Sequence, residues 1–472
     1  MIQAVQTLWT AGKRLTDDSF GWKHPKYHLM SWALSCLELR QTYDSVVLYA
    51  DSAAAQVLAD KMGLPYTDVK ACYDHLPVSP RHWSYAKIMT YKDQSRPFLH
   101  IDGDVFLPRA LSKDITEAGL VVQNRENVTS YYRDMFDKIL SQGPIRLPEY
   151  LSDALRSTAP VSYNAGVFGG SDVHFIQRYC DEVAALYRDN GLYDTGRSLG
   201  NGFNVLSEQV LFAALATAEH KHVTTVLDTC CNDNGYRRAD FCNFRHYDTN
   251  TLMHVIGGHK RNDGVCAMIE KTLIRKYPQY YQRLMAFIGT AAHDNTPKLR
   301  TGNTTLTPNE CMATYRGFKD CAMYDWGMIP ESRMLHTLRM SASFTDFLNA
   351  DEEERQSYVI KRNPMLKVFH IDSTWCHEAR QAMASRLNAK VADDIGLLPT
   401  LHGDISETAI GDWGHNILAL LDRPMRFAAL LRAFSSHADF PTGYDVEPPL
   451  LREMEYLLYH GVIIAVKANN NN

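Results

Sequence analysis

Two aspartates separated by one glycine, Asp102 and Asp104, lie in the apolar segment RPFLHIDGDVFL. We predict a strand broken by a polar turn, in which Gly103 lets the backbone turn tightly between the two carboxylates. Two aligned carboxylates bind a hard divalent cation through oxygen, and that cation can neutralise a departing diphosphate. Because Asp-Gly-Asp is also a common surface turn, the motif alone leaves both interpretations open.

A histidine, two glycines and a lysine follow further along the chain, in the segment TLMHVIGGHKRN. A neutral imidazole at His254 is a good ligand for manganese or a similar ion. Gly257 and Gly258 would let the backbone approach a phosphate, and Lys260 would offer that phosphate a positive charge. Histidine and glycine together more often form an ordinary loop, so this segment needs support from elsewhere in the chain.

A third segment, residues 163–170, reads YNAGVFGG. Small residues after a polar one suit a strand end that contacts a sugar, and a tight turn from strand to helix is the alternative. Taken in order, these segments resemble the motifs of glycosyltransferases with the GT-A fold, most nearly family eight, the glycogenin-like and galactosyltransferase-like group. The resemblance covers about the first 270 residues.

Four matches carry this resemblance, and their order along the chain is the argument. A helix with a lysine, SYAKIMTY, precedes the strand with the DxD-like motif. YNAGVFGG resembles the family's strand with asparagine, a small residue and glycine, and SEQVL resembles its acidic residue and glutamine at a helix start. HVIGGHK matches the HxxGxxK pattern. The family usually continues with Pro-Trp, where this chain has Arg261 and Asn262, so the donor sugar cannot be inherited.

The resemblance implies a role for each matching residue. Asp102, Asp104 and His254 would bind the cation, Mn²⁺ or Mg²⁺, and a UDP-sugar would be the donor. The other implied contacts are Lys260 and Gly257 with the diphosphate, Lys87 with the diphosphate or sugar, Asn164, Glu208 and Gln209 with the sugar and acceptor, and Thr7, Trp9, Tyr49 and Asp51 with the nucleoside. The nucleoside contacts rest on position in the chain and not on a motif.

The implied reaction is a sugar transfer with retention of anomeric configuration. The metal and Lys260 would stabilise charge on the departing nucleoside diphosphate while an acceptor hydroxyl attacks the anomeric carbon. Glu208 and Gln209 would stabilise an oxocarbenium-like centre. The family more often has aspartate where this chain has Glu208. The acceptor stays open among a peptide, another protein, a saccharide and a small molecule.

Strand-like and helix-like segments that alternate along residues 1–270 must position these residues. This order predicts an α/β fold with a mainly parallel, Rossmann-like sheet and helices on both faces, as in the GT-A fold. The predicted strands are 2–9, 44–51, 66–71, 96–107, 119–126 and 162–170, and the predicted helices are 28–43, 52–64, 84–94, 171–189 and 207–220. Ligands of such sheets bind beyond the carboxyl ends of the strands.

The chain of 472 residues is too long for one hydrophobic core. We predict a transferase domain over 1–295, a linker rich in Thr, Asn and Pro over 296–310, and an accessory domain over 311–472. Residues 412–467 resemble PqqD-like winged-helix peptide-binding modules, with VIKRNPMLKVFHIDST before them as a hairpin that offers a sheet edge. A helical cap or a dimer contact is the alternative for this region.

The composition fits a soluble cytoplasmic protein. The 49 basic and 54 acidic residues give a net charge of -5, so nucleic acid is not an expected partner. No apolar run reaches the length of a membrane span, and the N-terminus does not read as a signal peptide. The 10 cysteines form no disulfide framework, although Cys230, Cys231 and Cys242 leave a zinc site as a minor alternative.

Two other classes of function compete with the glycosyltransferase. A non-catalytic protein could keep the fold and bind a peptide or a nucleotide, but the presence of Asp102, Asp104 and His254 argues against a decayed site. A metal-dependent nucleotidyltransferase would also place carboxylates at strand ends. The HxxGxxK segment favours the glycosyltransferase, although one fold can host several functions.

Overall fold

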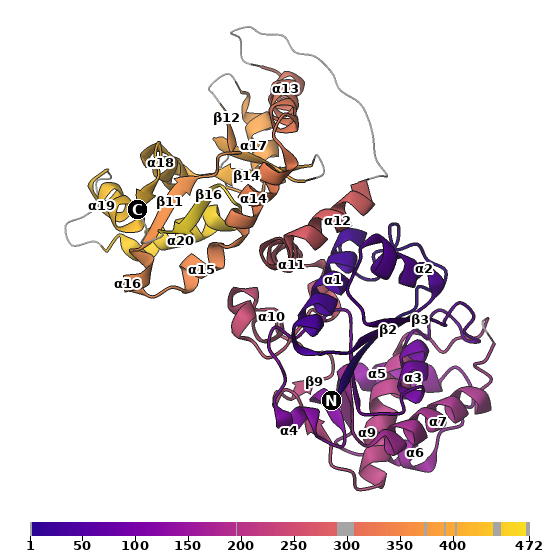
Figure 1. The fold of residues 1–472 in the computed structure, drawn as a ribbon. Coiled ribbons are helices and arrows are strands. Elements are labelled where there is room, and N and C mark those ends of the chain that lie inside the picture. Colours follow the sequence, from indigo (N-terminus) through magenta and orange to yellow (C-terminus); the bar gives the residue numbers. More distant parts are fainter. Residues whose placement is uncertain are drawn as a thin grey trace. The chain divides into compact units, whose positions relative to one another are not determined.

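A computed structural model describes residues 2–194, 196–289, 306–371, 375–390, 393–401, 404–437 and 445–468. The chain forms two compact units, residues 1–270 and 271–472 (Figure 1). The division falls inside a helix, α11 (Asp263–Lys276), upstream of the predicted linker. Residues 296–305 of that linker lie outside the described residues, and the predicted domain limits stay predictions.

An eight-stranded sheet forms the centre of the N-terminal unit, in the order β3-β2-β1-β4-β7-β6-β8, with β9 also paired to β6. The strands are β1 (Gln3–Leu8), β2 (Val46–Ala50), β3 (Asp68–Ala71), β4 (Phe98–Ile101), β6 (Val121–Asn127), β7 (Val161–Gly170), β8 (Thr224–Thr225) and β9 (Cys231–Asn232). Only β7 runs against its neighbours; the other pairings in this sheet are parallel. The predicted mainly parallel α/β fold is confirmed.

Both faces of this sheet are covered, because neighbouring residues of one strand enter different hydrophobic cores. Val5 packs in one core with Tyr85 and Phe212, while Ala4 packs in another with Leu39. The first core lies under α3 (Ser84–Lys92), α7 (Val173–Asp189) and α9 (Leu211–Ala218), and the second under α1 (Pro25–Thr42). Strands buried on both sides explain why the sequence shows apolar runs and no clean alternation.

The predicted helices of the first unit are present with shifted ends. Helix α1 begins at Pro25, and His24 caps it by accepting a hydrogen bond from the amide of Lys26. The helix predicted over 52–64 is a short α-helix, α2 (Ser52–Ala55), followed by a π-helical turn, η1 (Gln56–Lys61). The helix predicted over 207–220 likewise begins with α8 (Gly202–Val205) and a π-helical turn, η2 (Leu206–Val210), before α9.

A two-stranded ribbon beside the main sheet carries the candidate site. It pairs β5 (Val105–Phe106) with β10 (Met253–His254) in antiparallel fashion. The remaining elements of this unit are α4 (Lys113–Thr116), α5 (Ser130–Leu140), α6 (Glu149–Arg156), α10 (Arg238–Phe241), η3 (Phe244–Thr249) and η4 (Gly257–Arg261). The ribbon brings the residues around position 254 against those around position 104.

The C-terminal unit contains two separate three-stranded sheets, in the orders β15-β11-β16 and β12-β13-β14. Their strands are β11 (Tyr358–Arg362), β12 (Lys367–His370), β13 (Asp394–Pro399), β14 (Ile405–Ile410), β15 (Met425–Arg426) and β16 (Ile463–Lys467). The predicted hairpin within residues 359–374 is wrong, because β11 and β12 belong to different sheets. Between these strands, Asn363 contacts the chain just before β16 and does not form a hairpin turn: its side chain donates to the carbonyl of Gly461 at 2.8 Å.

The helices of this unit are α12 (Pro278–Gly289), α13 (Pro308–Gly327), α14 (Glu331–Ala342), α15 (Phe344–Asn349), α16 (Glu352–Arg355), α17 (His377–Arg386), α18 (Asp412–Leu420), α19 (Phe427–His437) and α20 (Glu447–Tyr459). The last three helices precede β16, with the short strand β15 between α18 and α19. The likeness to a winged-helix peptide-binding module stays a prediction. None of the described helices combines the length and apolarity needed to cross a membrane.

Candidate functional site

Asp102 and Asp104 lie in the turn that joins β4 to β5. The amide of Asp102 donates to the carbonyl of Gly166 on β7 at 2.9 Å, and the amide of Val105 donates to the carbonyl of Asp102 at 3.0 Å. The predicted turn is present, but Gly103 within it does not have a positive φ. A Cβ there would lie 2.3 Å from the ring of Trp32 on α1, so close packing requires the glycine.

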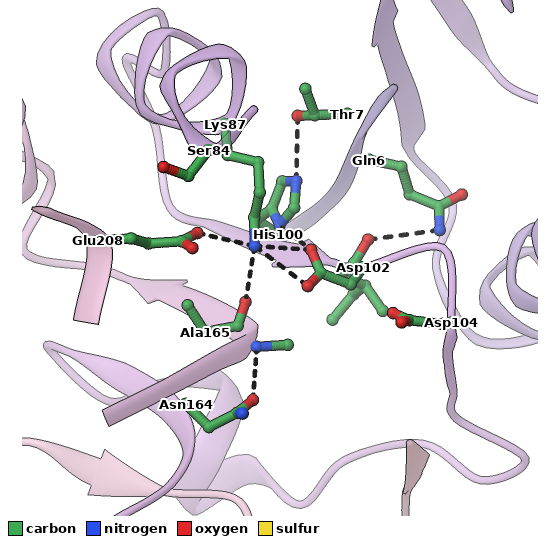
Figure 2. Close-up of polar contacts among 12 residues, drawn as sticks. Gln6, Thr7, Ser84, Lys87, His100, Asp102, Asp104, Asn164, Ala165 and Glu208 are labelled. Carbon is green, nitrogen blue, oxygen red and sulfur yellow. Dashed lines mark hydrogen bonds and ion pairs between the residues drawn. The ribbon is translucent and has the colours of Figure 1, made fainter. Parts of the chain in front are cut away.

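Lys87 on α3 binds Asp102 from one side (Figure 2). Its Nζ lies 2.8 Å from Oδ1 of Asp102 and 2.7 Å from Oε1 of Glu208, and it also contacts the carbonyl of Ala165 at 3.4 Å. The side chains of Lys87 and Glu208 are only 7% and 2% exposed, so this is a buried cluster. Tyr91 adds a hydroxyl that donates to Glu208 at 3.1 Å.

Asp104 forms a second cluster with two residues of the HxxGxxK segment. Nζ of Lys260 lies 2.6 Å from Oδ2 of Asp104, and Nε2 of His254 lies 3.5 Å from Oδ1. The amide of Val255 donates to the carbonyl of Asp104 at 3.0 Å, which fixes the ribbon register. The sequence positions 104, 254 and 260 therefore meet, as the predicted motif requires.

The two aspartates titrate in opposite directions. Burial raises the pKa of Asp102, and the negative charge of Asp104 adds to that effect against the attraction of Lys87. Burial, the largest single effect, would also raise the pKa of Asp104, but the charges and hydrogen bonds of Lys260 and His254 together outweigh it, so this pKa is lowered. Burial would lower the pKa of Lys87, yet the charges of Asp102 and Glu208 raise it. The site thus keeps Lys87 charged and favours ionised Asp104.

Two of the residues predicted to contact a sugar, Asn164 and Glu208, contact protein groups near this turn. Asn164 on β7 is 2% exposed, and its Oδ1 accepts from the amide of Gly166 at 2.9 Å. Glu208 lies behind Lys87, so in this arrangement it fixes the lysine. Oε1 of Gln209 is buried and has no hydrogen-bond partner among the described residues. Gly169, at the other end of β7, lies opposite Leu99, away from Asp102.

The predicted nucleoside contacts lie along β1, β2 and the start of α2. Thr7 donates to Oγ1 of Thr90 at 2.8 Å, and Trp9 packs on the first hydrophobic core. The hydroxyl of Tyr49 donates to Asp93 at 2.7 Å. Asp51 caps α2 by accepting from the amide of Ala54 at 2.8 Å, and its other oxygen accepts from the hydroxyl of Thr10 at 2.8 Å. As placed, Tyr49 and Asp51 serve the fold.

Sequence reasoning missed several residues that hold the site. Ser31 and Ser35 on α1 donate to the carbonyls of Gly103 and Val105 at 2.6 and 2.7 Å, which anchors the turn between β4 and β5. Gln123 on β6 contacts His254 at 2.8 Å. These residues belong to no motif, although the sequence does show a polar pair, Gln123 and Asn124, inside an apolar strand.

Metal ligation is less complete than the motif suggests. Within the described ranges, no three His, Cys, Asp or Glu side chains are grouped so that they could hold a metal ion as they stand. Asp102 contacts Lys87, whereas Asp104 and His254 face each other. The thiols of Cys230, Cys231 and Cys242, the zinc alternative, are free. Gly257 begins η4 with a φ of 56°.

A family model described as "Family of unknown function (DUF6734)" matches residues 2–287, which is more than half of the chain. The chain belongs to the DUF6734 family. The model spans every residue of the candidate site in this DUF6734 protein. A comparison with curated proteins finds no match.

Similar solved structures include that of the inositol-1-phosphate CTP transferase from T. maritima, which is 15% identical. The match covers 58% of this chain and 96% of that chain, with a TM-score of 0.29. Another is the apo form of mouse xyloside xylosyltransferase 1, which is 10% identical, with 48% and 84% of the two chains covered and a TM-score of 0.25. Similarity this low carries no argument about what the DUF6734 protein does.

Proposed function

We propose that this protein is a metal-dependent glycosyltransferase that takes a sugar from a nucleotide-sugar donor, with UDP as the first nucleotide to test. One observation carries the proposal. Two carboxylates at the end of β4 meet two lysines and a histidine from segments far apart in sequence, at the carboxyl edge of a mainly parallel sheet. Such an edge is where sheets of this kind bind their ligands.

The contact between Asp104 and His254 fits a divalent cation. A carboxylate oxygen and an imidazole nitrogen are both common ligands of divalent cations, and here they lie 3.5 Å apart. Asp104 and His254 would hold the ion, and Asp102 would be the third ligand. When bound, the ion would supply positive charge that neutralises a diphosphate.

The two lysines would take different tasks. Lys260, 24% exposed on its side chain, would bind phosphate oxygens. Lys87 would remain between Asp102 and Glu208 and keep the carboxylate of Asp102 in place. Asn164 and Gln209 would contact the sugar or acceptor, and the attacking hydroxyl would lose its proton to the leaving phosphate. The anomeric outcome and the acceptor class stay predictions.

Calorimetric titration with UDP, with and without Mn²⁺, tests the proposal. We expect binding at micromolar concentrations that requires the metal, and a loss of at least about tenfold in Asp104→Asn, equivalent to about 1.4 kcal/mol. Asp181→Asn is the matched control, since Asp181 is an exposed carboxylate paired with Lys92 on the protein surface. That control should bind as the unaltered protein does.

Three outcomes separate the rival functions. Turnover of a UDP-sugar with release of UDP would support the glycosyltransferase. Metal-dependent binding of CTP or another nucleoside triphosphate, with release of pyrophosphate and no sugar transfer, would replace it with a nucleotidyltransferase. Failure of UDP, GDP and CTP to bind at millimolar concentration would refute nucleotide chemistry at this site and leave a peptide-binding role for the C-terminal unit.

A further inference from the structure

His254 has its ring fixed from behind by an amide side chain. Nδ1 of His254 lies 2.8 Å from Oε1 of Gln123, on the side of the ring away from Asp104. Gln123 is fully buried and His254 is only 3% exposed, so water does not compete for this hydrogen bond. An amide oxygen can only accept, so Nδ1 must carry the proton.

The amide of Gln123 is itself oriented by a second amide. Its Nε2 donates to Oδ1 of Asn124 at 3.0 Å. Nδ2 of Asn124 in turn donates to the carbonyl of Arg125 at 3.1 Å and contacts the hydroxyl of Tyr236 at 3.3 Å. Because Nδ2 has a carbonyl acceptor, Asn124 presents its oxygen to Gln123. Gln123 then has to present its oxygen to His254.

Tyr236 is held by a buried carboxylate at the far end of this chain of contacts. Its hydroxyl donates to Oε1 of Glu126 at 2.5 Å. Ser162 and Tyr132 donate to the other oxygen of Glu126, at 2.7 and 3.2 Å. Glu126 is fully buried, so these hydroxyls can be directed toward it without competition from water. The hydroxyl of Tyr236 is therefore left as an acceptor for Nδ2 of Asn124.

The backbone of β6 and β7 is shaped around these side chains. The pairing of the two strands shifts register between Val122 and Asn124, so Gln123 lies at an irregularity of the sheet. Such irregularities re-aim side chains near functional sites. Gly166 on β7 leaves the space that they need, because a Cβ there would lie 2.4 Å from Oε1 of Gln123 and 2.8 Å from Cε1 of His254. Any larger residue at position 166 would push the side chains of Gln123 and His254 out of these positions.

We infer that Gln123 and Asn124 are positioning residues that fix His254 in the tautomer with a proton on Nδ1. The lone pair of Nε2 then points at Asp104, where an imidazole ligand needs it. The use of this lone pair for a cation rests on the proposed function, whereas the tautomer itself does not. Free histidine favours the opposite tautomer, so the relay from Asn124 through Gln123 sets the ring against its intrinsic preference.

Nitrogen NMR of the imidazole rings measures the tautomer directly. We would label histidine with ¹⁵N in the full-length protein without metal at about pH 7.5, and assign His254 by its loss in His254→Gln. The relay predicts a protonated Nδ1 and an unprotonated Nε2. Gln123→Met and Asn124→Leu should move His254 toward the Nε2–H tautomer or a mixture of the two.

Asn190→Leu is the matched control for loss of a buried amide. Asn190 is 6% exposed, and its side chain donates to the carbonyls of Arg146 and Leu186 at 2.9 and 2.8 Å. It shares no contact with His254, so this variant should keep the native tautomer. A purely structural role for Gln123 would destabilise the protein as this control does, without changing the tautomer of His254.

Titration with Mn²⁺ alone supplies a second readout. Loss of a hydrogen-bonding partner behind a ligating histidine lowers metal affinity about 10- to 100-fold, so we expect that loss in Gln123→Met and none in Asn190→Leu. A protonated Nε2 in the unaltered protein, or an unchanged tautomer in Gln123→Met, would overturn the relay. If NMR shows the expected tautomers but neither the unaltered protein nor any variant binds Mn²⁺, the relay is supported and the metal-dependent function is refuted.

Discussion

Replacing Lys87 with methionine should destabilise the N-terminal unit by about 3–5 kcal/mol, the usual effect of removing one partner of a buried ion pair. Methionine keeps most of the side-chain volume, so the change removes charge and little packing. Glu208, 2% exposed on its side chain, would lose a contact of 2.7 Å, and Asp102 would lose one of 2.8 Å. The buried carboxylate of Glu208 and the partly exposed carboxylate of Asp102 would then lie close together without a cation.

The loss should grow as pH rises. Burial already raises the pKa of Glu208, and removing Lys87 raises it further, so the variant binds a proton more tightly when folded than when unfolded. The stability that this proton contributes is present at low pH and is lost as pH rises through the raised pKa. We expect up to about 1.4 kcal/mol of additional loss per pH unit in that window.

A double-mutant cycle with Glu208→Gln isolates the interaction. Glutamine removes the charge that Lys87 neutralises, so Lys87→Met combined with Glu208→Gln should recover about 1.5 kcal/mol or more of the loss. Hydrogen exchange of peptides from β4 and β7 is the assay, because it reports on the N-terminal unit alone. A loss of 3 kcal/mol corresponds to exchange that is about a hundredfold faster.

A cost of less than about 1 kcal/mol for Lys87→Met, or additivity of the two substitutions, would contradict this prediction. Either result would mean that water or a neighbouring group already screens these charges. Loss of stability that is independent of pH would point instead to packing around the lysine stem. Lys92→Met is the control, since Lys92 lies on the same helix as Lys87 but forms an exposed pair with Asp181 on α7, and such pairs contribute about 1 kcal/mol or less.

Two further substitutions test how α1 supports the turn between β4 and β5. Burial, assisted by the charge of Lys260, lowers the pKa of His28 to about 3, so the unfolded chain binds the proton more tightly and stability falls as pH drops below about 6.5. Urea denaturation should show that, between about pH 6.5 and 4.5, the free energy of unfolding falls by about 2–3 kcal/mol less in His28→Gln than in the unaltered protein. Equal falls in the two proteins would contradict this prediction. Gly103→Ala should cost about 1–3 kcal/mol and weaken Mn²⁺ binding, because its Cβ would lie 2.3 Å from Trp32. Gly258→Ala, with open space around the added carbon, should leave both measurements unchanged.

The sequence predicts the elements of the sheet better than their pairing. Val46–Ala50 is buried at every position, which produces the apolar run that identifies it as a strand. Nothing local in residues 161–170 shows that β7 runs against its neighbours, because direction is set by where the chain returns to the sheet. The hairpin predicted after residue 358 failed for the same reason. Asn363 and its neighbours look like a turn, but their partner is the chain near Gly461.

In the candidate site, too, the sequence predicts some residues and not others. His254 and Lys260 could be predicted because one short segment carries both, and the β5–β10 ribbon brings them to Asp104. The surroundings of Glu208 could not, because the π-helical turn over Leu206–Val210 changes which side chains face inward. Gln123 escaped because its partner is 131 residues away and no motif includes it.

The two lysines show why similar ion pairs can have different functions. Lys87 lies between two carboxylates and is 7% exposed, so moving it would leave the buried carboxylate of Glu208 and the partly exposed carboxylate of Asp102 without a cation. Lys260 contacts one carboxylate and is 24% exposed, and the ring of Trp22 lies 5.8 Å from its ammonium group. A cation that neutralised Asp104 would free Lys260 from this ion pair without leaving a buried charge unpaired. Under the proposed function, Lys260 would therefore be the lysine that changes partners when a diphosphate and its metal bind, while Lys87 would hold the turn between β4 and β5.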